Sequence, residues 1–357
     1  MKTRKIQEVS GGTFTVSLPQ DLARSEKLSQ GDTVDLHTHI DGVLVVQPRD
    51  RETDPTGGVT LELRDPDDEK ILQSLWAAYT AGYTEITLTT RNAFTGSQRT
   101  VANEVTNVLA GTTVTTAADR EIAVRVHLDP EEISVRQLVR QLSFVALSVH
   151  QAAMTAVADG RTEVDFSDRD DHADRLFAMT ERSFVRALSR LSEVDSLGAT
   201  RPQLFELWST ARDLERVADH AERIGTIARG FDHPPDGDHV ATLQVLAEDA
   251  RDVVDHAVCG TVDAEGSGRV REALALRSHV REKVAEFDRR LFGDATSDYR
   301  LARVLDSVQR IAEHGGNIAE RGLQGTIRRE NGVSLDWREV TAGRPDTAPT
   351  DPAAEDD

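Results

Sequence analysis

The chain has 357 residues, of which 38% are hydrophobic, and its formal net charge is −20. That length allows two or three domains, each with a hydrophobic core. The acidity excludes indiscriminate binding to nucleic acid at low salt, but at molar salt the Debye length falls to about 3 Å and a DNA-binding module is compatible with it.

Arginine supplies nearly all of the positive charge, and an excess of acid with so little lysine is typical of proteins from a salt-loaded, halophilic cytoplasm. The one cysteine, Cys259, excludes an internal disulfide. No apolar run approaches the roughly 18 residues that span a bilayer. The N-terminus has no signal-peptide core, so we expect a cytoplasmic protein without membrane insertion.

Residues 1–49 alternate short apolar strands with turn signals, in the order strand, strand, helix, strand, strand. Such a unit is too small for a secure core of its own. The expected strands are Thr3–Glu8, Thr13–Leu18, Thr33–His37 and Val43–Gln47, and the expected helix is Gln20–Arg24.

The motifs Thr-Val-Ser-Leu-Pro, Leu-Ser-Gln-Gly-Asp-Thr-Val and Asp-Gly-Val-Leu-Val-Val-Gln-Pro of this region resemble the AbrB/SpoVT family. The resemblance implies a swapped-hairpin homodimer that binds DNA. Lys2, Arg4 and Lys5 would then contact phosphates. In the alternative interpretation these three side chains are merely solvated and the module only pairs two chains.

Residues 50–57 form a polar linker, and residues 58–128 read as a small α/β sandwich of βαβαββ type. The expected helices are Asp67–Ala81, with Ile71, Leu72, Leu75, Trp76 and Tyr79 facing inward, and Gly96–Leu109. The segment contains no phosphate loop, nucleophile elbow or metal-ligand cluster. We expect a packing or sensory role for it rather than catalysis.

From residue 130 onward the apolar spacing is helical, and the short loops predict two tandem three-helix bundles, 130–230 and 239–330. The expected helices are Ser134–Asp159, a second one that begins at Asp168, Pro202–Arg229, Val240–Cys259, Gly268–Phe292 and Ser297–Arg329. The apolar stripe of the second helix is expected to consist of Leu176, Phe177, Met179, Phe184 and Leu188. The last segment, 341–357, has the composition of a disordered acidic tail.

The third helix of the first bundle carries Glu215 and Asp219 one turn apart, so both carboxylates leave the same side. Like charges at this spacing repel unless a cation lies between them, and hard cations prefer carboxylate oxygen. The alternative is a solvated acidic face.

A second copy of this pattern lies 94 residues downstream (314 minus 220), where Arg-Ile-Ala-Glu-His around Glu313 and His314 matches Arg-Val-Ala-Asp-His around Asp219 and His220. Over residues 135–330 the chain therefore resembles the PhoU family of phosphate-uptake regulators. The resemblance implies a metal-binding acid motif in the third helix of each bundle. Gln309 stands where Glu215 stands in the first copy, and Asp306, one turn earlier, could substitute for the missing acid.

Asp171 and Asp174 look like the acidic start of the second helix in PhoU relatives, and they would face Glu215 and Asp219 if the helices are antiparallel. Such an oxygen-rich cluster suits a divalent or trivalent metal ion such as Mg, Mn, Ca, Zn or Fe. The alternative for this stretch is helix capping by Asp168 or Asp170, worth about 1 kcal/mol.

His220 and His314 each follow the acid by one residue, about 100° around the helix, which favours packing or outer-shell roles over direct ligation. Five further histidines have no paired spacing and are expected at the surface: His172, His233, His239, His256 and His279.

These observations predict a multidomain α+β protein: an N-terminal swapped-hairpin β module, a small α/β sandwich, then two tandem all-α three-helix bundles. The two resemblances imply a regulator of phosphate uptake and homeostasis, with promoter DNA as a partner and negative control of phosphate transport. The alternative is a metal-binding adaptor on phosphate ABC transporter components or their signalling system, without DNA contact. The Glu-x-x-His pairs of di-metal bundle enzymes are missing around Glu215 and Glu313, so we expect no enzyme.

Overall fold

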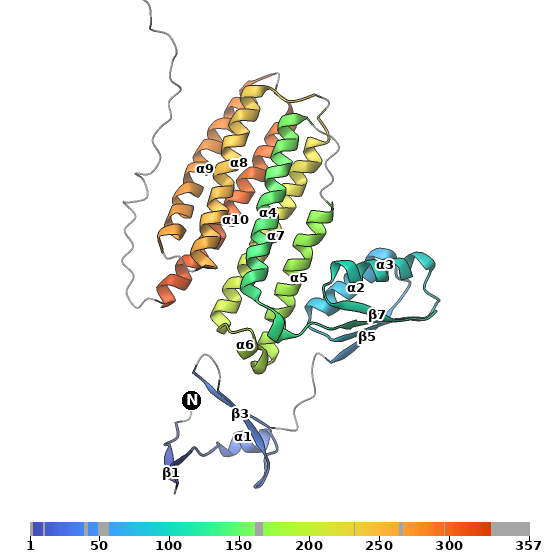
Figure 1. The fold of residues 1–357 in the computed structure, drawn as a ribbon, viewed down its shortest axis with the longest axis vertical. Coiled ribbons are helices and arrows are strands. Elements are labelled where there is room, and N and C mark those ends of the chain that lie inside the picture. The colour runs from blue at the N-terminus through green and yellow to red at the C-terminus, as the bar shows by residue number, and fades with distance from the viewer. Residues whose placement is uncertain are drawn as a thin grey trace, which may run out of the picture.

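The computed structural model describes residues 3–9, 11–38, 42–48, 57–160, 167–231, 233–263, 267–295 and 297–329. It confirms the predicted multidomain α+β class: small N-terminal sheets are followed by an α/β region and then by long helices (Figure 1). Lys2 and the predicted tail 341–357 lie outside the described residues.

The N-terminal module contains two separate antiparallel hairpins, β1–β2 and β3–β4. Its first strand begins four residues later than predicted, at Gln7. No described side chain between residues 3 and 48 is buried, and apolar side chains such as Phe14 (68% exposed) and Leu36 (62%) face solvent. A single copy of this module therefore has no core. Its elements are β1 (Gln7–Val9), β2 (Thr13–Thr15), α1 (Gln20–Ser25), β3 (Val34–Thr38) and β4 (Leu44–Pro48).

The α/β region is one four-stranded sheet in the order β5-β6-β8-β7, with β5 and β6 parallel and the other neighbours antiparallel. Thr95 and Gln98 form a capping box that starts α3. Leu72, predicted to face inward, is 39% exposed because it lies at the edge of the buried stripe of α2. The elements are β5 (Gly58–Leu63), α2 (Asp68–Thr80), β6 (Glu85–Thr90), α3 (Gly96–Val108), β7 (Thr112–Ala117) and β8 (Glu121–Val126).

The helical region follows the predicted helices closely and adds a short one, α6. One continuous hydrophobic core runs through helices of both predicted bundles, from Val135 to Ala319. The prediction that Leu188 belongs to the buried apolar stripe is wrong, since this side chain is 60% exposed. The elements are the short helix η2 (Pro130–Glu132), α4 (Val135–Asp159), α5 (Ser167–Ser189), α6 (Leu191–Ser196), α7 (Arg201–Ala228), α8 (Gly237–Thr261), α9 (Ser267–Gly293) and α10 (Tyr299–Arg329).

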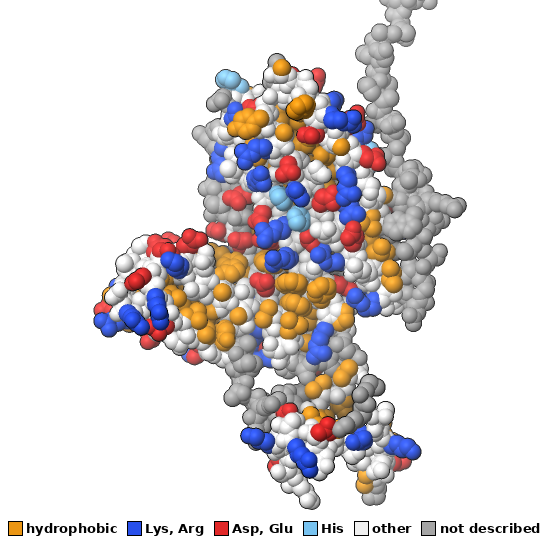
Figure 2. Space-filling view, turned by 180° about the vertical axis from the view of Figure 1, so that it is seen from behind, with side chains coloured by type: hydrophobic (Ala, Val, Ile, Leu, Met, Phe, Trp, Pro, Cys, Tyr) orange, Lys and Arg blue, Asp and Glu red, His pale blue; other side chains and the backbone are white. Residues whose placement is uncertain are grey.

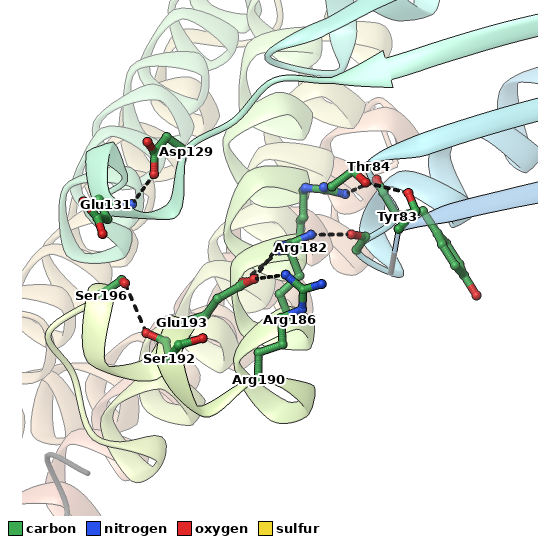
Figure 3. Close-up of polar contacts among 12 residues, drawn as sticks. Tyr83, Thr84, Asp129, Glu131, Arg182, Arg186, Arg190, Ser192, Glu193 and Ser196 are labelled. Atoms are coloured by element: carbon green, nitrogen blue, oxygen red, sulfur yellow. Dashed lines mark hydrogen bonds and ion pairs between the residues drawn. The ribbon is translucent and has the colours of Figure 1, made fainter. Parts of the chain in front are cut away.

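Two arginines of α5 attach the α/β region to the helices (Figure 3). The guanidinium of Arg182 donates to the carbonyls of Tyr79 at 2.6 Å and Tyr83 at 2.9 Å, and that of Arg186 donates to the carbonyl of Gly82 at 2.7 Å. Arg186 also pairs with Glu193. Because these groups are buried, each hydrogen bond satisfies an atom that would otherwise be costly to remove from water.

The mixed surface charge of the helices is visible from behind, where acidic and basic side chains alternate (Figure 2). Within the described residues no helix combines the length and the apolar character that a membrane span requires.

Candidate functional site: an acidic cluster between α5 and α7

Four of the predicted metal ligands lie on two neighbouring helices, Asp171 and Asp174 on α5 and Glu215 and Asp219 on α7. Burial and, after it, the charges of Glu215, Asp219 and Asp171 together raise the pKa of Asp174 to about 6. The repulsive part of this shift requires that the other carboxylates lie near Asp174. The structure thus brings the acids of the two helices into one cluster. The sequence alone does not determine this arrangement, because it does not fix how far the two helices are shifted along each other.

Arg216 of α7 places a positive charge beside the acids of the cluster. Its guanidinium lies 2.9 Å from a carboxylate oxygen of Asp219 and 3.4 Å from one of Glu215. The arginine side chain is 48% exposed, so it partly neutralises the two acids from the solvent side. This contact explains how α7 tolerates two acids one turn apart.

The donor set of the cluster consists of carboxylate oxygens, the ligands that hard cations prefer. In the part of the chain that the structure describes, no three His, Cys, Asp or Glu side chains converge closely enough to hold a metal ion. A metal ion would therefore have to draw the carboxylates of α5 and α7 together and displace Arg216. The carboxylate oxygens of the site are suitable ligands for a hard cation. In this structure, however, the side chains of Glu215 and Asp219 are oriented toward Arg216.

The second copy of the motif has different neighbours. Arg281 of α9 donates to both carboxylate oxygens of Glu313, at 2.8 and 2.9 Å. Arg277, one turn earlier on α9, pairs with Glu320 at 2.8 Å. Asp306 pairs loosely with Arg310, at 3.8 Å. Where α5 supplies acids to the first motif, α9 supplies arginines to the second, so Glu313 is already charge-compensated.

The two predicted bundles meet where α7 and α10 run antiparallel, in three layers seven residues apart on each helix. Glu206 pairs with Arg328, Asp213 with Arg321, and the ring of His220 faces that of His314 with 5.6 Å between centres. His220 and His314 are equivalent positions of the repeat, so their contact joins matching residues of the two copies of the motif. Asp213 was not identified from the sequence as a contact residue. The seven-residue spacing of Glu206, Asp213 and His220, which places all three on one face of α7, could have indicated it.

Charge and burial act in opposite directions in this contact. Burial raises the pKa of Asp213, but hydrogen bonds from His314 and Asn317 and the charge of Arg321 outweigh it and hold the pKa below its usual value. Burial lowers the pKa of His220, and the neighbouring His314 lowers it further. The contact is thus built around a carboxylate whose ionised form is stabilised by its neighbours.

Two other histidines lie in protected positions. His150, for which no prediction was made from the sequence, is completely buried in α4, and neither of its ring nitrogens has a hydrogen-bond partner among the described residues. Its pKa falls to about 3 because of burial and then because of the charge of Arg251. His239, expected at the surface, is 18% exposed, and its ring packs edge-on against Phe287.

The predicted DNA contacts are exposed. Arg4 reaches only the neighbouring carbonyl of Thr3, at 3.1 Å, and Lys5 is likewise on the surface. Lys2 lies outside the described residues, and so do the side chains of Asp168 and Asp170, the proposed capping residues.

Comparison with known families identifies the region that holds the acidic cluster. Residues 139–228 match the model of the PhoU domain. The chain contains a PhoU domain. Its matched range includes all four acids of the cluster, whereas Asp306 and Glu313 lie beyond it.

The N-terminal module also has a known relative. Residues 9–54 match the family described as antidote-toxin recognition MazE, bacterial antitoxin. The PhoU domain is therefore combined with a MazE/AbrB-like N-terminal domain, as the sequence motifs predicted.

A mouse (Mus musculus) protein described as testis-specific serine kinase substrate is 28% identical over 141 residues. The match covers 40% of this chain and 23% of the mouse protein. The chain thus spans about a quarter of that relative, and the similarity transfers no function.

Proposed function

We propose that this protein regulates phosphate uptake by binding promoter DNA, and that it represses phosphate transport when phosphate is plentiful. The observation that carries the proposal is the combination of a PhoU domain with a MazE/AbrB-like module in one chain. The first domain type is a phosphate-homeostasis regulator and the second a DNA-binding type. Their fusion supports direct control of transcription, and no catalytic role is proposed.

The N-terminal module supports dimerisation by its exposed apolar strands. Ile6, Phe14 and Leu36 are each more than 60% exposed, which a stable single module would not tolerate. A second copy would bury these side chains and would place two sets of Lys2, Arg4 and Lys5 on one side for the two DNA strands.

The acidic cluster is the proposed sensor site. Asp171, Asp174, Glu215 and Asp219 would hold a hard cation such as Mg²⁺, Mn²⁺ or Ca²⁺, and Arg216 would move into solvent. We assign the ion to the first motif rather than to Glu313 and Asp306, because Arg281 already neutralises Glu313. The ion would remove the repulsion between α5 and α7.

The decisive experiment is genome-wide crosslinking of the tagged protein in native cells at high and low phosphate. Peaks upstream of phosphate-transport genes that change with phosphate are the expected result. Absence of such peaks, with transporter or signalling proteins co-purifying instead, would establish the alternative adaptor function. Charge reversal by Arg4→Glu with Lys5→Glu provides the matched variant: it should abolish the peaks and leave the dimer intact.

A further inference from the structure

The contact between His220 of α7 and His314 of α10 brings together two imidazoles from helices that are remote in sequence. Their ring centres are 5.6 Å apart and the ring planes differ by 32°. The side chain of His314 is 21% exposed, so the pair lies at the edge of the α7–α10 contact and is reached by solvent.

Asp213 fixes the orientation of one ring. Its carboxylate accepts a hydrogen bond of 2.8 Å from Nδ1 of His314. Asp213 is held in turn by Arg321 and by the amide of Asn317, at 3.3 Å. The carboxylate therefore selects the tautomer of His314 that carries a proton on Nδ1 and a lone pair on Nε2. A carboxylate bound to one imidazole nitrogen is the usual outer-shell partner of a metal-ligating histidine.

His220 is free to act as the second donor. No hydrogen bond to its ring is found among the described residues, and the ring faces that of His314. The charges of Asp219, Arg223 and Asp306 act on this ring, so two acids and one arginine lie near it.

We propose that His220 and His314 form a binding site for a borderline transition-metal ion such as Zn²⁺, with Asp213 as the positioning residue for His314. A zinc–nitrogen bond is about 2.0–2.1 Å and the nitrogen is roughly 1 Å from the ring centre, so two rings on one tetrahedral ion have centres about 5 Å apart. The observed distance between the ring centres, 5.6 Å, is close to this value. Water would complete the coordination of an ion held by the two imidazoles.

This site differs from the acidic cluster in both ligand chemistry and direction. Imidazole nitrogen favours Zn²⁺, Cu²⁺ or Ni²⁺, whereas carboxylates favour Mg²⁺ or Ca²⁺. His220 follows Asp219 directly, about 100° around the helix, so the two side chains leave α7 on different sides. An ion held by both histidines would link α7 to α10 and so couple the two helices that carry the duplicated motif.

The test is titration calorimetry of the full chain with ZnCl₂ in a large excess of Mg²⁺, which saturates the carboxylates. We expect one equivalent of Zn²⁺ to bind. His220→Gln and His314→Asn should each weaken binding at least tenfold. The second variant keeps an amide N–H that can still donate to Asp213, so the α7–α10 contact is preserved. Asp174→Asn, in the acidic cluster, is the control that should leave Zn²⁺ binding unchanged.

A spectroscopic readout separates ligation from folding. Co²⁺ bound by two imidazoles gives a visible absorption band that depends on nitrogen ligands, and both histidine variants should lose it while their melting temperatures in EDTA stay close to that of the parent. Asp213→Asn should weaken Zn²⁺ binding by about 10–100-fold through the misplaced ring. Zn²⁺ affinity and the Co²⁺ band that persist in both histidine variants would overturn the proposal, as would their loss in Asp174→Asn.

Discussion

Asp213 of α7 and His314 of α10 are joined by a hydrogen bond of 2.8 Å, although 101 residues separate them in the chain. The same carboxylate pairs with Arg321, and its side chain is 10% exposed. One acid thus ties together the two helices that carry the duplicated motif. Three groups of α10 lose a partner when Asp213 is removed, namely His314, Asn317 and Arg321.

Asp213→Asn should therefore lower the free energy of unfolding by about 2 kcal/mol at pH 7, because Arg321 is left partly buried without its counter-charge. The pKa of Asp213 is held below 3.8 in the folded state, so its contribution is present at neutral pH and is lost as the pH falls through the folded value. Urea unfolding between pH 3 and pH 8 measures this. The matched control is Asp306→Asn, an exposed acid of α10, and an equal effect from both variants would contradict the assignment.

Asp174→Asn should have the opposite effect on the metal-free protein. A carboxyl whose pKa is raised to about 6 binds its proton more tightly when folded, so the wild type loses stability as the pH rises from 3.8 through 6. The variant should be more stable by about 1–2 kcal/mol at pH 7, after allowance for solvent screening, and equal to the wild type near pH 4. Thermal unfolding in EDTA over this pH range is the measurement.

Asp288→Asn removes the same charge from an exposed position on α9 and should change little at any pH. Addition of Mn²⁺ should stabilise the wild type and should stabilise Asp174→Asn less. A variant that is destabilised at pH 7 in EDTA would show that the carboxylate of Asp174 is not repelled by its neighbours.

His150→Leu tests a buried, unpartnered imidazole. With a folded pKa of about 3, His150 stays neutral while the unfolded chain takes up a proton below pH 6.5, so stability falls with decreasing pH. Between the folded pKa of about 3 and the unfolded pKa of 6.5, this single group changes the free energy of unfolding by about 1.4 kcal/mol per pH unit. His150→Leu should remove that slope and raise stability at pH 5, as measured by chemical denaturation. His172→Leu, at an exposed site on α5, should leave the slope unchanged.

Arg182→Gln should weaken the attachment of the α/β region. The arginine donates to two backbone carbonyls and lies over the ring of Tyr79 with 4.9 Å to the ring centre, so its loss leaves buried carbonyls unpaired. Hydrogen exchange should become faster by about tenfold or more in α2 and β6, while α7 and α10 stay protected. Arg91→Gln removes a solvent-exposed arginine from the same region and should have no such effect; comparable exchange in the two variants would refute the role of Arg182.

Leu36→Asp should dissociate the proposed dimer. The side chain is 62% exposed on β3 in one chain and would be buried by a second copy, where a carboxylate is costly. Light scattering should report a monomer, with the melting of the helical region unchanged. Leu188→Asp places the same charge at an apolar position on α5 that is 60% exposed, and it should leave the dimer intact. A monomeric wild type, or a Leu36→Asp dimer, would refute dimerisation through this module.

The sequence by itself determined which segments form helices and which form strands. Periodic apolar residues located α4, α5 and α7–α10 to within a few residues, since a helix that buries one face must repeat every three or four positions. The duplicated Arg-[Val/Ile]-Ala-acid-His pattern revealed the repeat for the same local reason. The alternation in residues 58–128 likewise indicated βαβαββ order.

Only the tertiary structure decided which charges meet. Asp219 and Glu313 occupy equivalent positions of the repeat, yet the first lies near acids of α5 and the second is paired with Arg281 of α9. Helix stagger fixes these partners, and it depends on how whole faces pack rather than on local spacing. The meeting of His220 with His314 has the same origin, because the antiparallel contact of α7 and α10 brings equivalent residues of the two halves together at one point.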